Sequence, residues 1–420
     1  MHKMISYPNG LRLIMKKLDF LRSVSVGVWV GAGSAYEKNN INGISHFIEH
    51  MLFKGTSNRS SFDIADSIDK IGGQINAFTA KEVTCYYTKS IDEHLEKCID
   101  ILSDMFFNST FDENELEKEK KVVLEEISMV EDSPEDVCHE NLAKLFFEGN
   151  PLEQPIVGTA ENVNNFDKDK LKKFMFSHYC PQNIVIAVAG NFDFDKLAEL
   201  IDKYFNQKFE GQENCLKAEP APKHASVPKT GCKIKQIEQA SIAIGFPSPM
   251  FNTKESNPMM IASNVLGGSM SSRLFQKIRE ELGLAYSVYS YMSSYKNNGI
   301  FSFYCGTNPQ NIEKAVKTVI DELKKFLKDG INDDEFERGK EQLKGNIILG
   351  QENTTSIMNV YGKMLLVSDQ IFDLDQKLKE INSITKDDVM DVARKYLDFE
   401  RACISCVANR PAEDLLQFLN

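Results

Sequence analysis

The chain has 420 residues, of which 42% are hydrophobic and 26% are charged, a composition typical of a globular protein in water. Its net charge of -12 argues against a nucleic-acid partner, because phosphate binding requires a basic surface, and a solvated acidic surface explains the charge most simply. At this length two or more domains are expected.

The N-terminal segment has the chemistry of two strands joined by a turn. MHKMISYPNGLRLIM places Asn9-Gly10, a preferred dipeptide of tight β-hairpins, between two apolar stretches. No signal peptide or transit segment is recognisable in the sequence, and no apolar run is long enough to cross a bilayer. Nine cysteines are scattered without a disulfide framework, so we expect reduced thiols and a cytoplasmic location.

Residues 46–50 read HFIEH. On a helix, His46 and His50 lie one turn apart on the same face, where two imidazoles can bind one metal ion. Glu49 is rotated by about 60° from His46, so its carboxylate stays free to accept a proton from an attacking water. Catalytic zinc sites use three protein ligands and keep one position open. The pattern predicts two zinc ligands and a general base, and its alternative is an ordinary amphipathic turn.

A helix over 113–131 supplies a candidate third ligand. Its apolar stripe consists of Leu116, Val122, Val123, Ile127 and Val130. Glu119 and Glu126 lie on the same stripe, two turns apart, where a carboxylate is costly unless a cation neutralises it. A metal held by the two histidines would satisfy Glu126, and Glu119 would then orient a ligand. The alternative is a skewed stripe that leaves both glutamates exposed.

The second half of the chain repeats the first. Residues 111–127 align without gaps to 331–347, and each is preceded by a helical segment and an alternating strand. The stretch 213–231, rich in Pro, Lys and small residues, is typical of a linker. We therefore predict an α+β fold of two similar domains, 1–212 and 232–420, each a mainly antiparallel sheet backed by helices. HFIEH has no counterpart in the second domain, which is expected to be metal-free.

CISC at 403–406 has the spacing of a redox pair. It lies in RACISCVA, however, which alternates like a strand, so buried core cysteines are the favoured interpretation over a redox or metal pair. A thiol oxidoreductase is therefore the weakest hypothesis, since no helix N-terminus is expected beside either thiol to lower its pKa.

HFIEH followed by VVLEEI resembles the pitrilysin-type metallopeptidases with the inverted zinc motif. The chain is most similar to the group containing the mitochondrial processing peptidase β subunit and its bacterial relatives. The likeness extends over nearly the whole chain through HFIEHMLFKGT, GGQINAFTAKEVTCYY and LGGSMSSRLFQKIREELGLAYSVYS. It implies one Zn²⁺ per chain, held by His46, His50 and Glu126, with Glu49 as the general base. It also implies that the two domains form a clam-shell half.

The resemblance assigns roles to three further residues near the reaction. Glu119 matches an acidic orienting position seven residues before the third ligand. Arg279 and Tyr286, in IREELGLAY, match an arginine–tyrosine pair that the family's metal-free domain contributes to the active site. The tyrosine would donate to the developing oxyanion, and the arginine would steady the substrate.

The resemblance also implies two substrate-binding segments. Asn76, Ala77 and Phe78, in INAFTAKE, match an edge strand that receives the substrate as an added strand. Taken alone, that segment is a strand whose packing explains most of its residues. Asp136 and Glu140 match acidic positions that hold a basic residue of the substrate, and the alternative is an acidic surface helix.

Together these features predict a zinc-dependent endopeptidase that acts on extended or unfolded peptides, with a preference for sites near basic residues. A single chain type carries both the zinc motif and VLGGSMSS at the position of the family's glycine-rich loop. That combination indicates a homodimer, and it favours general peptide hydrolysis over precursor processing. The alternative from another functional class is a non-catalytic structural subunit of a larger complex.

Overall fold

The computed structural model describes residues 1–209, 219–412 and 414–420, which form two compact units. Unit 1 comprises Met1–Ile127, Gln154–Pro220 and Leu349–Phe372, and unit 2 comprises Ser128–Glu153, Ala221–Ile348 and Asp373–Asn420. Each unit therefore takes in one segment from the opposite half of the sequence. The sequence domains 1–212 and 232–420 stay a prediction, and residues 213–218 of the predicted linker lie outside the described residues.

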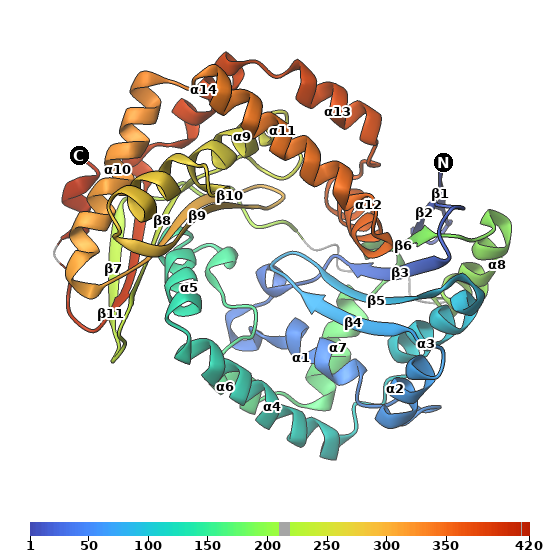
Figure 1. The fold of residues 1–420 in the computed structure, drawn as a ribbon. Helices are drawn as coiled ribbons and strands as arrows, with labels where there is room; N and C mark the ends of the chain where they lie inside the picture. Colours follow the sequence, from blue (N-terminus) through green and yellow to red (C-terminus); the bar gives the residue numbers. More distant parts are fainter. Residues whose placement is uncertain (210–218, 413) are drawn as a thin grey trace. The chain divides into compact units, whose positions relative to one another are not determined.

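Unit 1 contains a six-stranded mixed sheet with the order β1-β2-β6-β3-β5-β4 (Figure 1). The strands are β1 (His2–Ser6), β2 (Arg12–Lys17), β3 (Ser23–Val30), β4 (Gln74–Thr79), β5 (Thr84–Ile91) and β6 (Ile184–Gly190). Strands β2 and β6 are parallel, and all other neighbouring pairs are antiparallel. The turn at Asn9-Gly10 joins β1 to β2 as predicted, with Gly10 at a φ of 95°.

Helices cover both faces of this sheet. On one face lie α1 (Ile44–Leu52), α3 (Leu95–Asn108) and α8 (Phe194–Tyr204), and the other face is covered by α12 (Thr354–Ser368). The indole N–H of Trp29 donates to Met358 Sδ on α12 at 3.2 Å. The remaining helices that lie wholly or mostly in unit 1 are α2 (Ser61–Asp69), α4 (Glu113–Asp132), α6 (Ala160–Asn164) and α7 (Lys168–His178). This double cover explains why β3 and β6 are almost entirely apolar and buried.

Unit 2 contains a five-stranded sheet with the order β7-β11-β8-β10-β9. Its strands are β7 (Lys229–Ile234), β8 (Ala240–Pro247), β9 (Ala285–Ser294), β10 (Gly299–Thr307) and β11 (Cys403–Ala408). Strands β7 and β11 are parallel, and the other pairs are antiparallel. The order and directions match those of β2-β6-β3-β5-β4 in unit 1. This match confirms the predicted α+β fold of two similar, mainly antiparallel sheets backed by helices.

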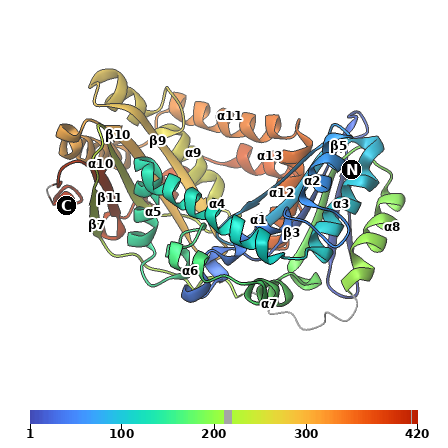
Figure 2. The same ribbon diagram turned by 90° about the horizontal axis from the view of Figure 1, so that it is seen from below.

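Helices also cover both faces of the sheet in unit 2. One face carries α9 (Ser256–Gly267), α10 (Ile312–Asp329) and α14 (Lys386–Tyr396). The other face carries α5 (Pro134–Phe146), which lies beside β11 in both views (Figures 1 and 2). The remaining helices are α11 (Asp333–Gly350), α13 (Leu374–Ser383) and a π-helix (Phe275–Glu281). One face of each sheet is thus covered by a helix from the other half of the sequence. Helix α12 covers the sheet of unit 1, and α5 covers the sheet of unit 2.

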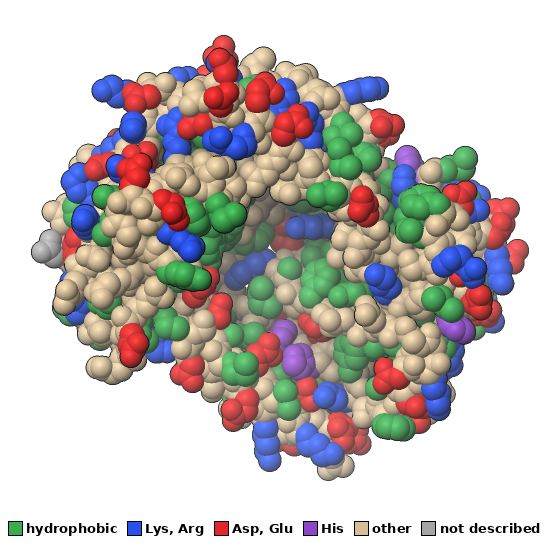
Figure 3. Space-filling model, viewed as in Figure 1, with side chains coloured by type: hydrophobic (Ala, Val, Ile, Leu, Met, Phe, Trp, Pro, Cys, Tyr) green, Lys and Arg blue, Asp and Glu red, His purple; other side chains and the backbone are tan. Residues whose placement is uncertain are grey.

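On the face shown in Figure 3, acidic and basic side chains are interspersed and form no continuous basic field. No helix in the described part of the chain combines the length and the apolar character needed to cross a membrane.

Seven of the described cysteines are free thiols, whereas Cys180 is disulfide-bonded. The expectation of reduced thiols throughout is therefore wrong at Cys180, and Cys215 lies outside the described residues.

A buried carboxylate fastens the segment after α1 to α3. Asp104, which is 3% exposed, accepts hydrogen bonds from Thr56 Oγ1 at 2.8 Å and Asn58 Nδ2 at 2.6 Å. It also accepts hydrogen bonds from Arg59 Nη1 at 2.7 Å and Asn108 Nδ2 at 2.8 Å. Burial raises the pKa of Asp104, but these donors outweigh burial and hold the pKa below its usual value.

Candidate metal and catalytic site

The helix α1 carries HFIEH, and a buried glutamate fixes its N-terminus. Glu37 accepts the backbone N–H of Gly43 at 2.6 Å, the backbone N–H of Ser45 at 2.8 Å and the side-chain amide of Asn42 at 2.9 Å. Its carboxylate lies where the helix dipole is positive. Gly43 has a φ of 95°, and a Cβ there would lie 2.7 Å from the Cα of Gly158. The turn into α1 therefore requires glycine.

The structure brings the three predicted ligands together in unit 1. His46 Nε2 lies 3.6 Å from Glu126 Oε2, and His50 Nε2 lies 3.5 Å from the same oxygen. All three ligand atoms lie within 4.8 Å of one another. Atoms bound tetrahedrally to zinc at about 2.05 Å are about 3.4 Å apart, so this donor set fits one ion. No other set of three His, Cys, Asp or Glu side chains in the described residues meets this spacing.

Burial and charge set the protonation of these ligands. Burial, followed by the neighbouring His50, lowers the pKa of His46 to about 4 against the opposing charge of Glu126. Burial also lowers the pKa of His50, but hydrogen bonds with Glu119 and Glu126 outweigh it and raise this pKa to about 9. The hydrogen bond with His50 lowers the pKa of Glu126 despite burial. A bound metal ion would take the place of the proton on His50.

Glu119 orients His50. Its Oε1 lies 2.8 Å from His50 Nδ1, which leaves Nε2 of the ring directed at the metal position. Its Oε2 lies 2.7 Å from Lys54 Nζ. Burial raises the pKa of Glu119, but the contacts with His50 and Lys54 outweigh it and lower the pKa. Lys54 was not among the sequence candidates, although its position four residues after His50 was a usable signal.

Glu49 lies beside the metal ligands without being one of them. Thr79 Oγ1, at the end of β4, donates to Glu49 Oε2 at 2.6 Å. Burial raises the pKa of Glu49, and the hydrogen bond from Thr79 opposes that shift. The carboxylate is therefore held in place with a raised proton affinity, as a general base requires. Thr79 was missed because its contact with α1 depends on how distant segments pack.

The three predicted strand residues lie on β4, the last strand of its sheet. Among the described residues β4 pairs with β5 alone, so its other edge offers backbone groups to an added strand. The N–H of Ala77 donates to Oδ1 of Asn76 at 2.8 Å, and Phe78 follows. A pocket of about 380 Å³ adjoins the start of the strand and is lined by Ala65, Ile68, Asp69, Gly73, Gln74, Ile75, Asn76 and Tyr87.

The remaining predicted residues belong to unit 2, whereas the metal ligands belong to unit 1. Arg279 Nη1 donates to the carbonyl oxygen of Tyr286 at 2.8 Å, and its guanidinium lies 4.5 Å from the centre of that ring. Tyr286 is 72% exposed. Asp136 and Glu140 lie on α5, with Asp136 in its exposed first turn. The roles of these four residues in the reaction stay predictions.

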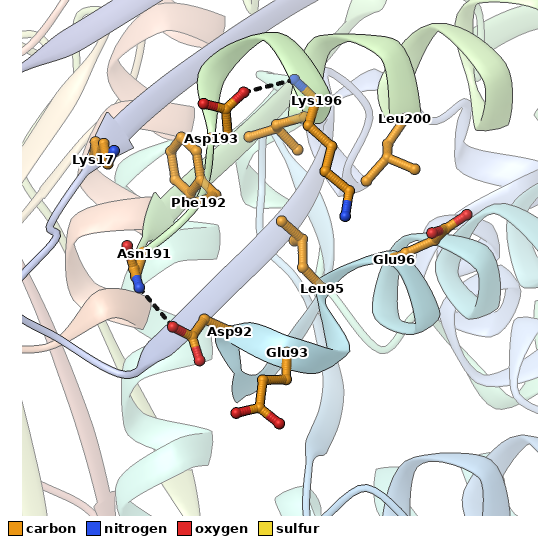
Figure 4. A pocket seen from close by; sticks show the side chains of 11 residues that line it. Lys17, Asp92, Glu93, Leu95, Glu96, Asn191, Phe192, Asp193, Lys196 and Leu200 are labelled. Atoms are coloured by element: carbon orange, nitrogen blue, oxygen red, sulfur yellow. Dashed lines mark hydrogen bonds between the residues drawn. The ribbon is translucent and has the colours of Figure 1, made fainter.

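A second pocket in unit 1 has different chemistry (Figure 4). Its volume is about 420 Å³, and it is lined by Lys17, Asp92, Glu93, Leu95, Glu96, Asn191, Phe192, Asp193, Lys196, Leu197 and Leu200. Asp92 accepts from Asn191 at 2.6 Å, and Asp193 accepts the backbone N–H of Lys196 at 3.0 Å. Asp92 follows the last residue of β5, whose first residue is Thr84, so the pocket lies about 25 Å along that strand from the Thr79 end. It takes no part in the metal site.

The chain is similar to known peptidases in sequence and in fold. Residues 12–160 match the family model described as Insulinase (Peptidase family M16), and residues 165–343 match one described as Peptidase M16 inactive domain. A Bacillus subtilis protein named as an uncharacterized zinc protease is 43% identical to this chain, and the match covers 98% of this chain and the full length of that protein. A Helicobacter pylori protease shares the fold with a TM-score of 0.90 at 23% identity, over 97% of this chain and 99% of its own. A chain of Complex III2 from Candida albicans also has this fold, with a TM-score of 0.85 at 20% identity over 99% of both chains.

Proposed function

Because the chain belongs to the insulinase family of peptidases (peptidase family M16), we propose that it is a zinc-dependent endopeptidase. The observation that carries the proposal is the convergence of His46, His50 and Glu126 on one position, with Glu49 beside it and not bound. Two imidazoles and a carboxylate are a donor set that zinc prefers in catalytic sites. The zinc protease name of the Bacillus subtilis relative supports the same metal.

Each residue of the site in unit 1 has a separate role in the proposed reaction. When bound, zinc supplies Lewis-acid chemistry that makes water nucleophilic near neutral pH and polarises the scissile carbonyl. Glu49, held by Thr79, takes the proton of the attacking water and delivers it to the leaving amine. Glu119 keeps the proton of His50 on Nδ1, so that Nε2 remains available as a ligand.

The substrate is an extended or unfolded peptide that adds to the free edge of β4. Hydrogen bonds to the main chain give affinity without a strict sequence requirement, and Ala77 supplies one N–H that its neighbour Asn76 covers in the free protein. From unit 2, Tyr286 would donate to the oxyanion while Arg279 steadies the peptide, as the family resemblance implies. A preference for basic residues rests on the acidic first turn of α5.

The alternative function is that of a non-catalytic structural subunit. The fold likeness to a chain of Complex III2 favours it, although likeness at 20% identity concerns the fold alone. The complete set of ligands, and the position of Glu49 beside them without being a ligand, favour the peptidase, since a structural subunit needs neither. A homodimer and a cytoplasmic location stay predictions.

The test replaces Glu49 by glutamine, with Glu125→Gln as the matched control. Glu125 is an exposed glutamate beside the third ligand. We expect E49Q to keep its fold and its zinc, and to lose turnover of unfolded peptides by about 10²- to 10⁴-fold, while E125Q keeps wild-type turnover. Cleavage by E49Q at the wild-type rate contradicts the mechanism. A wild-type protein that binds no zinc and cleaves no peptide supports the structural subunit instead.

A further inference from the structure

Two cysteines from distant parts of the sequence are neighbours at the edge of the unit 2 sheet. Cys232 in β7 is the register partner of Cys406 in β11, and the two strands are parallel. Adjacent strands lie about 4.8 Å apart, inside the range of about 4.4–6.8 Å that disulfides span between Cα atoms. The neighbouring Cys232 thiol also contributes, after burial, to the raised pKa of Cys406. A disulfide between them therefore needs no large movement of the backbone.

The two thiols differ in access to solvent. Cys232 is exposed on the edge strand, and its Sγ lies 3.8 Å from the carbonyl oxygen of Arg410. Cys406 is 0% exposed and belongs to the apolar core between the sheet and its helices. Burial, followed by the neighbouring thiols, raises the pKa of Cys406. Oxidants therefore reach Cys232 first, and Cys406 is held next to it as a second thiol.

The other nearby cysteines are directed away from this pair. Side chains alternate along a strand, so Cys403 and Cys406, three residues apart, lie on opposite faces of β11. Cys403 Sγ donates to the carbonyl oxygen of Val227 at 3.3 Å. Cys138, on α5, lies 3.6 Å from Oγ of Ser405, which points to the face opposite Cys406. Among the described cysteines near β11, the CISC spacing therefore forms no redox pair, whereas the cross-strand pair has the spacing that a disulfide requires.

We propose that Cys232 and Cys406 form a peroxide-sensitive dithiol, a reversible oxidation site separate from the metal centre. The Cys232 sulfur attacks one oxygen of hydrogen peroxide, the O–O bond breaks, and a sulfenic acid forms while the second oxygen leaves as water with the thiol proton. The Cys406 sulfur then attacks Cys232 Sγ, the S–S bond forms and the S–O bond breaks. The hydroxyl leaves as water with the Cys406 proton, so two thiols and one peroxide give one disulfide and two waters.

A disulfide between Cys232 and Cys406 would link the exposed edge strand β7 covalently to β11. Within the described part of the chain, strand β7 pairs with β11 alone, and most of its residues are exposed. A bond to β11 fixes this strand to the buried interior of the sheet and closes a covalent loop from residue 232 to residue 406. Because one sulfur of the bond lies at the surface, a small thiol can attack it and restore both cysteines.

The test maps the cysteines of the full-length chain after a few-fold molar excess of hydrogen peroxide. Remaining thiols are alkylated, and the unreduced digest is analysed by mass spectrometry. We expect a linked peptide pair containing Cys232 and Cys406, which disappears after dithiothreitol, while Cys138 and Cys403 are recovered alkylated. In C232S, which changes an exposed side chain and should fold, Cys406 should be recovered alkylated after unfolding.

Three results overturn the proposal. The first is recovery of Cys232 mainly as sulfinic or sulfonic acid, which shows that no second thiol captures the sulfenic acid. The second is a link from Cys232 to another cysteine or to a second copy of the chain. The third is a Cys232–Cys406 link that dithiothreitol does not reverse, since the proposal places one sulfur of the bond at the surface. C232S, which cannot form the link, is the control for the assignment of the linked peptides.

Discussion

Replacing Glu119 by glutamine changes the support of the metal site without changing its ligands. Glu119 is 3% exposed, with Oε1 at 2.8 Å from His50 Nδ1 and Oε2 at 2.7 Å from Lys54 Nζ. Glutamine keeps the size but loses the charge. Hydrogen bonds to charged groups contribute about 1.5–3 kcal/mol, and about 1.4 kcal/mol corresponds to a factor of ten. We therefore expect zinc affinity to fall by about 10- to 100-fold.

The assay is competition for zinc between the protein and a chelator of known affinity. Glu117→Gln is the control on the same helix, because the Glu117 side chain is 67% exposed and pairs with Lys120 and not with a metal ligand. At saturating zinc, E119Q should regain most of its peptide turnover, since Glu49 and all three ligands are unchanged. Zinc affinity of E119Q equal to that of E117Q would refute the orienting role of Glu119.

Three further outcomes are expected. Thr79→Val removes the donor that opposes the raised pKa of Glu49, so the acidic limb of kcat/KM should move to higher pH, and an unmoved limb contradicts the contact. Gly43→Ala forces a positive φ on alanine and should lower the melting temperature clearly, whereas Gly345→Ala, in open space within a helix, should leave it unchanged or raise it. The pKa of Asp104 is depressed in the folded state, so its stabilisation is present above the unfolded value near 3.8 and is lost as pH falls below it. Asp104→Asn should therefore lower the free energy of unfolding by about 2 kcal/mol at pH 7, and the difference from wild type should shrink in acid urea titrations.

The ligands were predictable because the signals for them are local. HFIEH fixes two imidazoles one helical turn apart, and the third ligand followed from a carboxylate on a buried stripe. In the structure Leu116 and Val123 are buried and Glu119 is 3% exposed, as that reasoning requires, but the side chain of Glu126 is 39% exposed and does not lie on a buried face. Val122, however, is 49% exposed, so its place in the apolar stripe was wrong. The buried stripe of α4 is narrower than predicted, because Leu116, Glu119 and Val123 are its buried residues.

The contacts that hold the site were not predictable from periodicity. Thr79 reaches Glu49, and Glu37 reaches the N-terminus of α1, only after strands and loops have packed. The free edge of β4 depends on strand order, which alternation along a single strand does not encode. Likewise the apolar face of α12 indicates burial but not which sheet it covers, and so the exchange of α5 and α12 between the halves was not foreseen.

The central claim is that one zinc ion is held by two imidazoles and a distant carboxylate. The most direct measurement is diffraction from crystals of the zinc-loaded protein, recorded on both sides of the zinc absorption edge. We expect one strong anomalous peak within about 2.0–2.2 Å of Nε2 of His46, Nε2 of His50 and a carboxylate oxygen of Glu126, with Glu49 not coordinated. A peak elsewhere, or one that Glu126 does not reach, contradicts the assignment.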